Sequence, residues 1–330
     1  MTRPVTLFTG QWADLPFEEA CKLASEMGFE GLEIACWGDH MDVRRAATDP
    51  AYVAERKSIL SKYGLQCWAL GGHLAGQCVG DVWDKRLDNF APADVKGKPE
   101  AIRLWAIEEM KYTAQAAKAM GCKIVTGFMG SSIWRFWYSF PQTSDEMIEE
   151  GYDEIVALWT PILDEFKACG VKFALEVHPT EIAFDFYTTR KVFREKFKDN
   201  DTLGINFDPS HLIWQGMEPH LFIREFGDKI FHVHIKDAMV NLHGTEGILG
   251  SFLTFGDTRR GWNFVSPGHG SVNFELIIRE LNACGYQGPL SVEWEDSAMD
   301  RVVGATEACE MVKQINFSPS TVAFDEALRK

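Results

Sequence analysis

The sequence lacks the features that would assign it to several common classes of protein. Its 330 residues contain no Cys-x-x-Cys pair, and no apolar run reaches the roughly 18 residues that a membrane helix needs. No segment resembling a signal peptide follows Met1, so we expect a cytoplasmic protein that makes no membrane contact. The 8 cysteines are scattered, which is typical of reduced, buried thiols rather than of a disulfide framework.

Positive charge is also scarce. The formal net charge is −15, from 33 Lys and Arg residues against 48 Asp and Glu residues. A nucleic-acid-binding protein normally carries a basic face that neutralises phosphates, so this balance argues against DNA or RNA as a partner. We expect a small-molecule partner instead, and an anionic surface suits a site that concentrates metal ions. The sequence says little about assembly and leaves a homo-oligomer open.

Short β-rich runs alternate with longer amphipathic stretches along the whole chain. Eight such units favour a parallel sheet closed into a (β/α)₈ TIM barrel, an α/β fold that covers residues 1–330 as a single domain. An open, doubly wound sheet is the alternative, but no G-x-G-x-x-G motif follows the first strand. The expected strands begin near residues 5, 31, 66, 123, 172, 203, 230 and 289. The expected helices cover residues 17–27, 51–63, 98–120, 145–169, 188–198, 219–226, 274–284 and 302–312.

The same helix-ending signal recurs along the chain. A glycine follows the last turn of four expected helices, at Gly28, Gly121, Gly170 and Gly285. Glycine adopts the left-handed conformation of a helix C-cap without strain at Cβ. A repeated corner of this kind favours a repetitive barrel over two unlike domains.

Three expected connections are unusually long, at about residues 71–97, 129–144 and 237–272. All three leave the carboxyl end of a strand, so we expect long βα loops over the C-terminal face of the barrel. The second and third are rich in aromatic residues, among them Trp134, Trp262 and Phe264. Aromatic faces there suit stacking on sugar rings, and loop packing or a subunit contact is the alternative.

Ionisable side chains gather at the carboxyl ends of the last four expected strands. These ends face the mouth of a barrel, and a buried charge is costly unless it is paired or binds a metal. Alternation places two candidates on one face of most of these strands, and depth then selects one ligand from each. The selected ligands of a divalent cation are Glu176, Asp208, His234 and Glu293. Three carboxylates and one imidazole suit Mn²⁺ or Mg²⁺ first, with Co²⁺ and Zn²⁺ as alternatives.

Several segments at these strand ends resemble a known family. They are Gly31-Leu-Glu-Ile, Leu175-Glu-Val-His-Pro179, Asn206-Phe-Asp-Pro-Ser-His211, His232-Val-His-Ile-Lys-Asp237, Pro267-Gly-His-Gly270 and Val292-Glu-Trp-Glu295. In order and spacing they are similar to segments of the xylose-isomerase-like TIM-barrel superfamily. That superfamily includes sugar isomerases and epimerases, inosose-processing enzymes and AP endonucleases of the endonuclease IV type, the AP endonuclease family 2 fold. The resemblance implies the same four metal ligands.

The resemblance also implies a chemistry. In related ketose epimerases the two glutamate ligands exchange protons on opposite faces of the substrate, which implies Glu176 and Glu293 as an acid/base pair here. A metal-bound ketone or hydroxyl acidifies the neighbouring C–H group, and the cation stabilises the enediolate that forms. We therefore expect a manganese-binding isomerase or epimerase of carbohydrate metabolism, acting on a sugar or cyclitol.

Other activities stay open. A glutamate and an arginine of the ketose epimerases are replaced here by Ile182 and Val240. The alternative is a lyase that performs β-elimination on a 3-keto glycoside or an anhydrosugar, as a C-glycoside deglycosidase does. An AP endonuclease would need more histidines on the early strands than His73. A non-catalytic binding protein is a further alternative.

Further residues are candidate substrate contacts. His211 resembles the family residue that hydrogen-bonds a substrate oxygen. The other candidates lie at strand ends or in the long loops and are His178, His73, Trp37, Trp134 and Arg259. Glu33 is expected either to contact substrate or to pair with a loop base. We expect His232 to support a ligand rather than to bind metal, and Lys236 to form an ion pair with Asp237.

Overall fold

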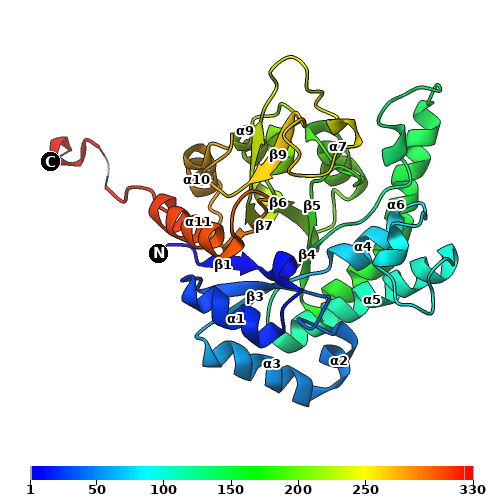
Figure 1. Cartoon of the computed structure of the whole chain (residues 1–330), viewed down its shortest axis with the longest axis horizontal. Helices are drawn as coiled ribbons and strands as arrows, with labels where there is room; N and C mark the ends of the chain where they lie inside the picture. The colour runs from blue at the N-terminus through cyan, green and yellow to red at the C-terminus, as the bar shows by residue number, and fades with distance from the viewer. Residues whose placement is uncertain (1, 323, 330) are drawn as a thin grey trace.

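The computed structural model describes residues 2–322 and 324–329. Within them, eight parallel strands close into a barrel that helices surround (Figure 1). The order around the barrel is β1, β10, β7, β6, β5, β4, β3 and β2, which confirms the predicted (β/α)₈ barrel and excludes the open sheet. The barrel strands are β1 (Val5–Phe8), β2 (Gly31–Ala35), β3 (Gln66–Gly71), β4 (Ile124–Gly127), β5 (Lys172–Glu176), β6 (Leu203–Phe207), β7 (Ile230–Ile235) and β10 (Leu290–Val292).

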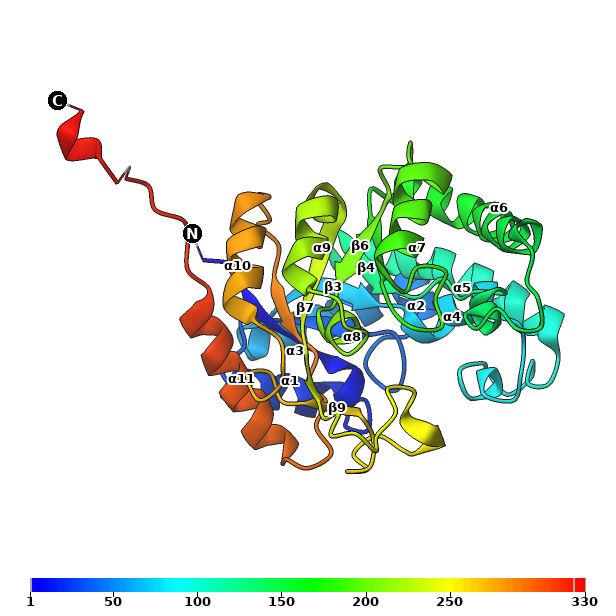
Figure 2. The ribbon, with the colours of Figure 1, turned by 90° about the horizontal axis from the view of Figure 1, so that it is seen from above.

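The predicted helices lie outside the barrel, close to their expected positions. They are α1 (Phe17–Glu26), α3 (Pro50–Lys62), α5 (Pro99–Met120), α6 (Asp145–Cys169), α7 (Phe186–Arg190), α9 (Pro219–Phe226), α10 (Phe274–Ala283) and α11 (Arg301–Ile315). The helix α7 continues as a π-helix over Lys191–Lys196. Two short helices, α2 (Val43–Thr48) and α8 (Ser210–Ile213), were not predicted. After α11 the chain leads away from the barrel (Figures 1 and 2).

Local sequence determines where these helices begin and end. The side chains of Ser144 and Asn273 accept hydrogen bonds from the third residue of α6 and α10, which satisfies backbone amides that have no partner inside the helix. The four predicted glycine caps all have positive φ angles. These angles are 90° at Gly28, 86° at Gly121, 67° at Gly170 and 77° at Gly285.

The three long connections leave β3, β4 and β7, but two of them are not irregular loops. The first contains α4 (His73–Gly80), and the third folds into an antiparallel hairpin of β8 (Asp237–Val240) and β9 (Trp262–Val265). Glycine has a low helix propensity, so the segment that contains Gly76 and Gly80 was not predicted to form the helix α4. In the fold they are needed, because a Cβ at Gly76 would overlap the carbonyl oxygen of Phe128. Close packing of α4 against the segment after β4 therefore outweighs the low helix propensity.

Two expectations from composition can be compared with the structure. All eight cysteines are free, as expected for reduced thiols, but only four of them are buried and Cys284 is exposed. In the described part of the chain, no helix combines the length and the apolar character of a membrane span.

Candidate metal centre

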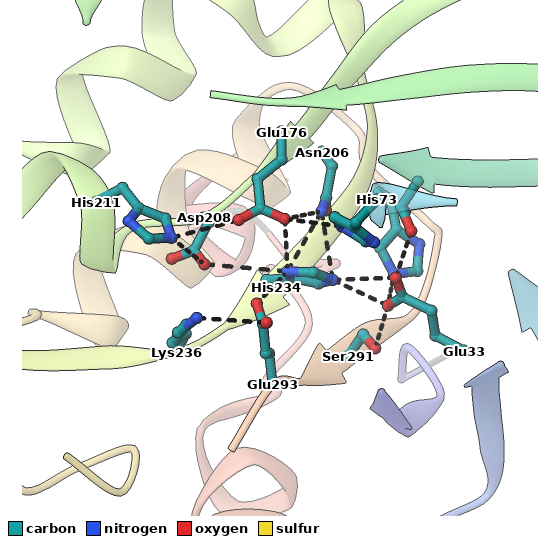
Figure 3. A network of polar contacts seen from close by, with 12 residues as sticks. Glu33, His73, Glu176, Asn206, Asp208, His211, His234, Lys236, Ser291 and Glu293 are labelled. Carbon is teal, nitrogen blue, oxygen red and sulfur yellow. Dashed lines mark hydrogen bonds and ion pairs between the residues drawn. The ribbon is translucent and has the colours of Figure 1, made fainter. Parts of the chain in front are cut away.

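Four side chains converge at the carboxyl end of the barrel (Figure 3). Glu176 ends β5, Asp208 directly follows β6, His234 lies in β7 and Glu293 directly follows β10. Each offers an atom within 4.8 Å of the atoms offered by the other three, and all four residues are buried. These strands are neighbours in the barrel, so their ends meet at one edge. The structure brings the predicted ligand set together, and metal binding itself stays a prediction.

The ring of His234 faces carboxylates on two sides. Its Nε2 atom lies 2.9 Å from Oε2 of Glu33, and its Nδ1 atom lies 2.8 Å from Oε2 of Glu293 and 3.3 Å from Oε2 of Glu176. A neutral imidazole has one N–H group and one lone pair. If Nε2 donates its proton to Glu33, the Nδ1 lone pair faces two carboxylates. That arrangement needs either a second proton on the ring or a cation between these groups.

The carboxylate of Asp208 has one satisfied and one unsatisfied oxygen. Its Oδ1 atom accepts hydrogen bonds from the amide and hydroxyl groups of Ser210, at 2.8 and 2.7 Å. Its Oδ2 atom is buried and has no hydrogen-bond donor among the described residues. Burying a carboxylate oxygen that has no hydrogen bond is costly, and the nearest basic atom, Nε2 of His211, lies 3.5 Å away. Because Oδ2 belongs to an oxygen-rich group of four ligand atoms, the residues present fit a divalent cation of the Mn²⁺ or Mg²⁺ type.

Neighbouring basic side chains keep the two glutamates ionised. Burial would raise the pKa of Glu176, but hydrogen bonds from His211 and His234 hold that pKa well below its ordinary value. Burial also opposes ionisation of Glu293, but Lys236 and His234 lower its pKa to about 2. Both carboxylates are therefore negatively charged near neutral pH.

The other two members of the group, Asp208 and His234, have pKa values that are raised rather than lowered. Burial raises the pKa of Asp208. For His234, burial favours the neutral ring, but the charges of Glu33 and Glu293 outweigh it and raise the pKa well above its ordinary value. A metal that binds Nδ1 must therefore displace a proton from His234.

Glu33 of β2 supports His234 from inside the barrel. Its buried carboxylate accepts hydrogen bonds from Thr126 and, at 2.8 Å each, from His232 and Ser291. Glu33, His232 and His234 also offer atoms within 4.8 Å of one another. Because Nε2 of both histidines already faces Glu33, we interpret this group as a hydrogen-bonded support, the role expected for His232.

Lys236 contacts a proposed ligand of the metal centre, although the sequence had led us to expect an ion pair with Asp237. Its Nζ atom lies 3.3 Å from Oε1 of Glu293 and 3.2 Å from Oε1 of Glu295. The predicted ion pair with Asp237 is therefore wrong. Adjacent residues of a strand point to opposite faces, so Lys236 and Asp237 point apart. Lys236 shares its face with His234 instead, and this alternation could have predicted its position.

Asp237 has a structural role instead. Its carboxylate accepts hydrogen bonds from the backbone amides of Gly268, Gly270 and Val272, at 3.0, 2.9 and 3.1 Å. These residues follow β9, so Asp237 fixes the base of the β8–β9 hairpin beside β7.

Two amide side chains that the sequence did not single out orient the glutamates. Gln11, in a 3₁₀ turn after β1, donates to Oε1 of Glu293 at 3.0 Å, and Asn206 of β6 donates to Oε2 of Glu176 at 3.0 Å. Isolated amide residues form no motif, so nothing in the sequence pointed to Gln11.

A cavity of about 490 Å³ opens onto the centre, within the range of about 300–1,000 Å³ that is usual for ligand sites. Four of the predicted substrate contacts line it, namely Trp37, His73, His178 and His211. Nε2 of His73 lies 3.2 Å from Oε2 of Glu176, and Nε2 of His211 lies 3.3 Å from Oε1 of the same carboxylate. The hairpin contributes Trp262 and Phe264 to the wall, so aromatic faces of the third loop lie beside the centre.

The other two predicted contacts lie elsewhere. Trp134 lines an adjoining cavity rather than the one at the centre. Arg259 lies outside both cavities, and its guanidinium pairs with Asp257 at 2.6 Å. The structure does not bring Arg259 to the centre, because a carboxylate two residues away already satisfies its charge.

Comparisons with known proteins agree with this architecture. The sequence profile described as xylose isomerase-like TIM barrel matches residues 21–315. The uncharacterized protein YfiH of Bacillus subtilis (strain 168) is 25% identical over 329 residues, which cover 93% of this chain and 97% of YfiH. Inosose dehydratase of Clostridium perfringens is 25% identical over 187 residues, which cover 54% of this chain and 59% of that enzyme.

Solved structures share the fold at lower sequence identity. The 3-keto-D-glucoside 4-epimerase YcjR of Escherichia coli superimposes with a TM-score of 0.67 and 16% identity, covering 94% of this chain and 99% of YcjR. A xylose isomerase-like TIM barrel protein of Mycobacterium smegmatis, solved in complex with magnesium, gives a TM-score of 0.63 and 16% identity, covering 96% and 97% of the two chains.

Proposed function

Because the chain belongs to the xylose isomerase-like TIM barrel family, we propose that it is a divalent-metal-dependent sugar isomerase or epimerase. Proteins similar to it include sugar epimerases and an inosose dehydratase. The observation that carries the proposal is the convergence of Glu176, Asp208, His234 and Glu293 on one point beneath a cavity. The proposed reaction moves a proton at a carbon next to a keto group of a sugar or cyclitol.

These four residues would hold one divalent cation, most favourably Mn²⁺. When bound, such a cation supplies a Lewis acid that polarises a substrate carbonyl and offsets negative charge formed beside it. Nδ1 is the atom of His234 that would serve, because Nε2 faces Glu33.

Glu176 and Glu293 are the proposed acid/base pair. Both line the cavity, and both are ionised near neutral pH for the electrostatic reasons given above. Asn206 fixes Oε2 of Glu176, and Gln11 fixes Oε1 of Glu293, so each carboxylate has a defined orientation. One carboxylate takes the proton from carbon, and the other returns a proton from the other side. The configuration at that carbon is inverted, or the carbonyl moves to the neighbouring carbon. His211, beside Glu176, is proposed to hydrogen-bond a substrate oxygen.

A lyase is the second candidate, and the similarity to inosose dehydratase favours it. It would begin with the same removal of a proton next to the carbonyl. The two reactions differ afterwards, because a lyase expels an oxygen substituent from the next carbon whereas an isomerase returns a proton.

The test is a substrate panel in D₂O. The protein is loaded with Mn²⁺ or Mg²⁺ and incubated with keto sugars, keto cyclitols and 3-keto glycosides, and the products are analysed by NMR after the protein is removed. An isomerase incorporates deuterium next to the carbonyl and yields an isomer. A lyase releases water or an alcohol and yields an unsaturated product. Absence of deuterium incorporation, of an isomer and of an unsaturated product for every compound, with metal-loaded protein, would overturn both candidates.

A further inference from the structure

A second cavity adjoins the metal cavity. Its volume is about 510 Å³, close to the 490 Å³ of the metal cavity and within the usual range for ligand sites. Four side chains line both cavities, namely Leu74, Phe128, His178 and Thr180. The two spaces are therefore neighbours with a common wall.

His178 of the common wall packs against His211, which lies beside the proposed metal ligands. Its ring centroid lies 4.2 Å from that of His211 and 4.7 Å from that of Phe128. His211 in turn lies 3.3 Å from the carboxylate of Glu176. The second cavity thus begins one aromatic ring away from the side chains that surround the proposed reaction.

Two carboxyl groups, one buried and one half-buried, fix the backbone that follows β4 beside the second cavity. Glu181 accepts hydrogen bonds from the backbone amides of Met129 and Gly130, both at 2.7 Å, and Asp81 accepts one from the amide of Ser131 at 2.9 Å. Three consecutive amides after β4 are therefore fixed by side chains from two other segments. The second cavity is pre-formed, which reduces the entropy that a ligand loses on binding.

The common wall also contains a strained residue. Thr180 has a φ angle of 89°, in a region that β-branched residues rarely adopt. Hydrogen bonds from the amide of Glu181 to the carbonyl of His178, and from the amide of His178 to the carbonyl of Ala183, close this turn. Strain of this kind persists only where the surrounding structure enforces it, and it clusters at ligand sites.

The lining of the second cavity suits a sugar ring. Two indole rings, Trp83 and Trp134, provide flat apolar faces; the first is held by a hydrogen bond to Asp88 and the second packs edge-on against Phe184. Polar side chains lie around them, namely Asp84, Arg86, Ser131, Ser132 and Arg135. A sugar ring offers C–H faces to aromatic rings and hydroxyl groups to polar side chains, so a lining of both kinds suits it.

We propose that the second cavity binds a second sugar ring, so that the substrate is a disaccharide whose keto-bearing ring lies in the metal cavity. The assignment of the keto-bearing ring rests on the proposed function, but binding of the second ring does not. Disaccharide binding can therefore be tested separately from catalysis.

The kinetic test compares a 3-keto disaccharide with the 3-keto form of methyl glucoside. Trp134→Ala removes one indole from the second cavity, and Trp137→Ala is the matched control, because Trp137 lies in the same loop and lines neither cavity. We expect Trp134→Ala to lower kcat/KM roughly tenfold for the disaccharide, which corresponds to about 1.4 kcal/mol, and to leave the methyl glycoside unchanged, since only the disaccharide would contact this indole. Trp137→Ala should leave both values unchanged.

A second variant fills the cavity rather than emptying it. Ser132→Phe places a large ring in the second cavity and should exclude the disaccharide while the methyl glycoside still reacts. The proposal is overturned if the unmodified protein does not prefer disaccharides, if the variants lower both substrates equally, or if an aryl glycoside replaces the disaccharide as the preferred substrate.

A binding measurement keeps the two proposals distinguishable. Saturation-transfer NMR of the Mg²⁺-loaded protein with maltose, cellobiose and trehalose reports contact with unoxidised disaccharides. Binding that Trp134→Ala removes and Trp137→Ala retains supports the second sugar site, even if no keto sugar reacts and the proposed function fails. Absence of binding by all three disaccharides, and of any disaccharide preference in turnover, overturns the second sugar site and leaves the proposed function standing.

Discussion

Nε2 of His234 lies 2.9 Å from Oε2 of Glu33, and this contact directs Nδ1 of the same ring toward Glu176 and Glu293. A carboxylate behind a histidine fixes which ring nitrogen carries the proton and raises the basicity of the other. Glu33→Gln should therefore weaken Mn²⁺ binding by roughly 10- to 100-fold at constant pH. Titration calorimetry in competition with a chelator measures this change. Unchanged affinity would show that Glu33 does not orient the ligand.

Metal binding should release a proton. The pKa of His234 is raised well above its ordinary value by Glu33 and Glu293, despite burial, so the ring is protonated near neutral pH before the metal binds. Because the metal needs the Nδ1 lone pair, its affinity should increase with pH up to the pKa of His234. In the metal-free protein the sign for stability is opposite: a raised pKa stabilises the fold below about pH 6.5, and this contribution is lost as the pH rises toward the folded-state pKa. Calorimetry in buffers of different ionisation enthalpy counts the released protons, and a count near zero would contradict the assignment.

Removing either proposed acid/base group should reduce turnover. Glu176→Gln and Glu293→Gln keep the shape of the side chain but cannot accept the proton, so we expect kcat to fall by at least roughly 10²-fold. Glu55→Gln, on the exposed face of α3, is the control and should retain full activity. Metal content is measured for each variant, because these glutamates are also proposed ligands. Full activity of both variants on the true substrate would rule out the acid/base role.

The buried carboxyl group of Glu181 should make stability depend on pH. Burial raises its pKa to about 8, and the nearby charge of Asp81 acts in the same direction. A raised folded-state pKa means that this group destabilises the fold as the pH rises from its ordinary value of about 4.5 to about 8. Glu181→Gln stays neutral and can still accept the amide hydrogen bonds, so its free energy of unfolding should decline less over that pH window. Parallel pH profiles from urea denaturation would disprove the assignment.

The glycines of α4 should tolerate no side chain. A methyl group at Gly76 would overlap the carbonyl oxygen of Phe128, and overpacking of this kind typically costs about 1–3 kcal/mol or more. Gly247→Ala is the matched control, because a Cβ there meets no atom within 4 Å and its φ angle is not in the left-handed region. Thermal unfolding should show a clear loss for Gly76→Ala and a change within about 0.5 kcal/mol for the control. Equal stability of the two variants would contradict the close packing.

The barrel and the position of the four candidate ligands could be predicted from the sequence because both depend on local order along the chain. Glu176 ends one buried apolar strand and Glu293 directly follows another, and parallel strands place such residues at the same edge. The hydrogen bonds that orient these residues could not be predicted, because they form only when the barrel closes. Gln11 and Glu293 are 282 positions apart, and they meet only because β1 pairs with β10. Lys236 was assigned to its sequence neighbour Asp237 for the same reason, since its partners Glu293 and Glu295 follow β10, far away along the chain.

The segment of residues 237–272 has two parts, and the hydrogen bonds from three backbone amides to Asp237 hold only one of them in place. The base of the hairpin is anchored directly beside His234, whereas residues 241–261 form a tip beyond the paired strands. Insertions or substitutions in that tip can therefore reshape what the cavity admits without moving the ring of His234. Phe255 of the tip lines the cavity, so the shape of the cavity and the geometry of the strand ends are set by separate segments of the chain.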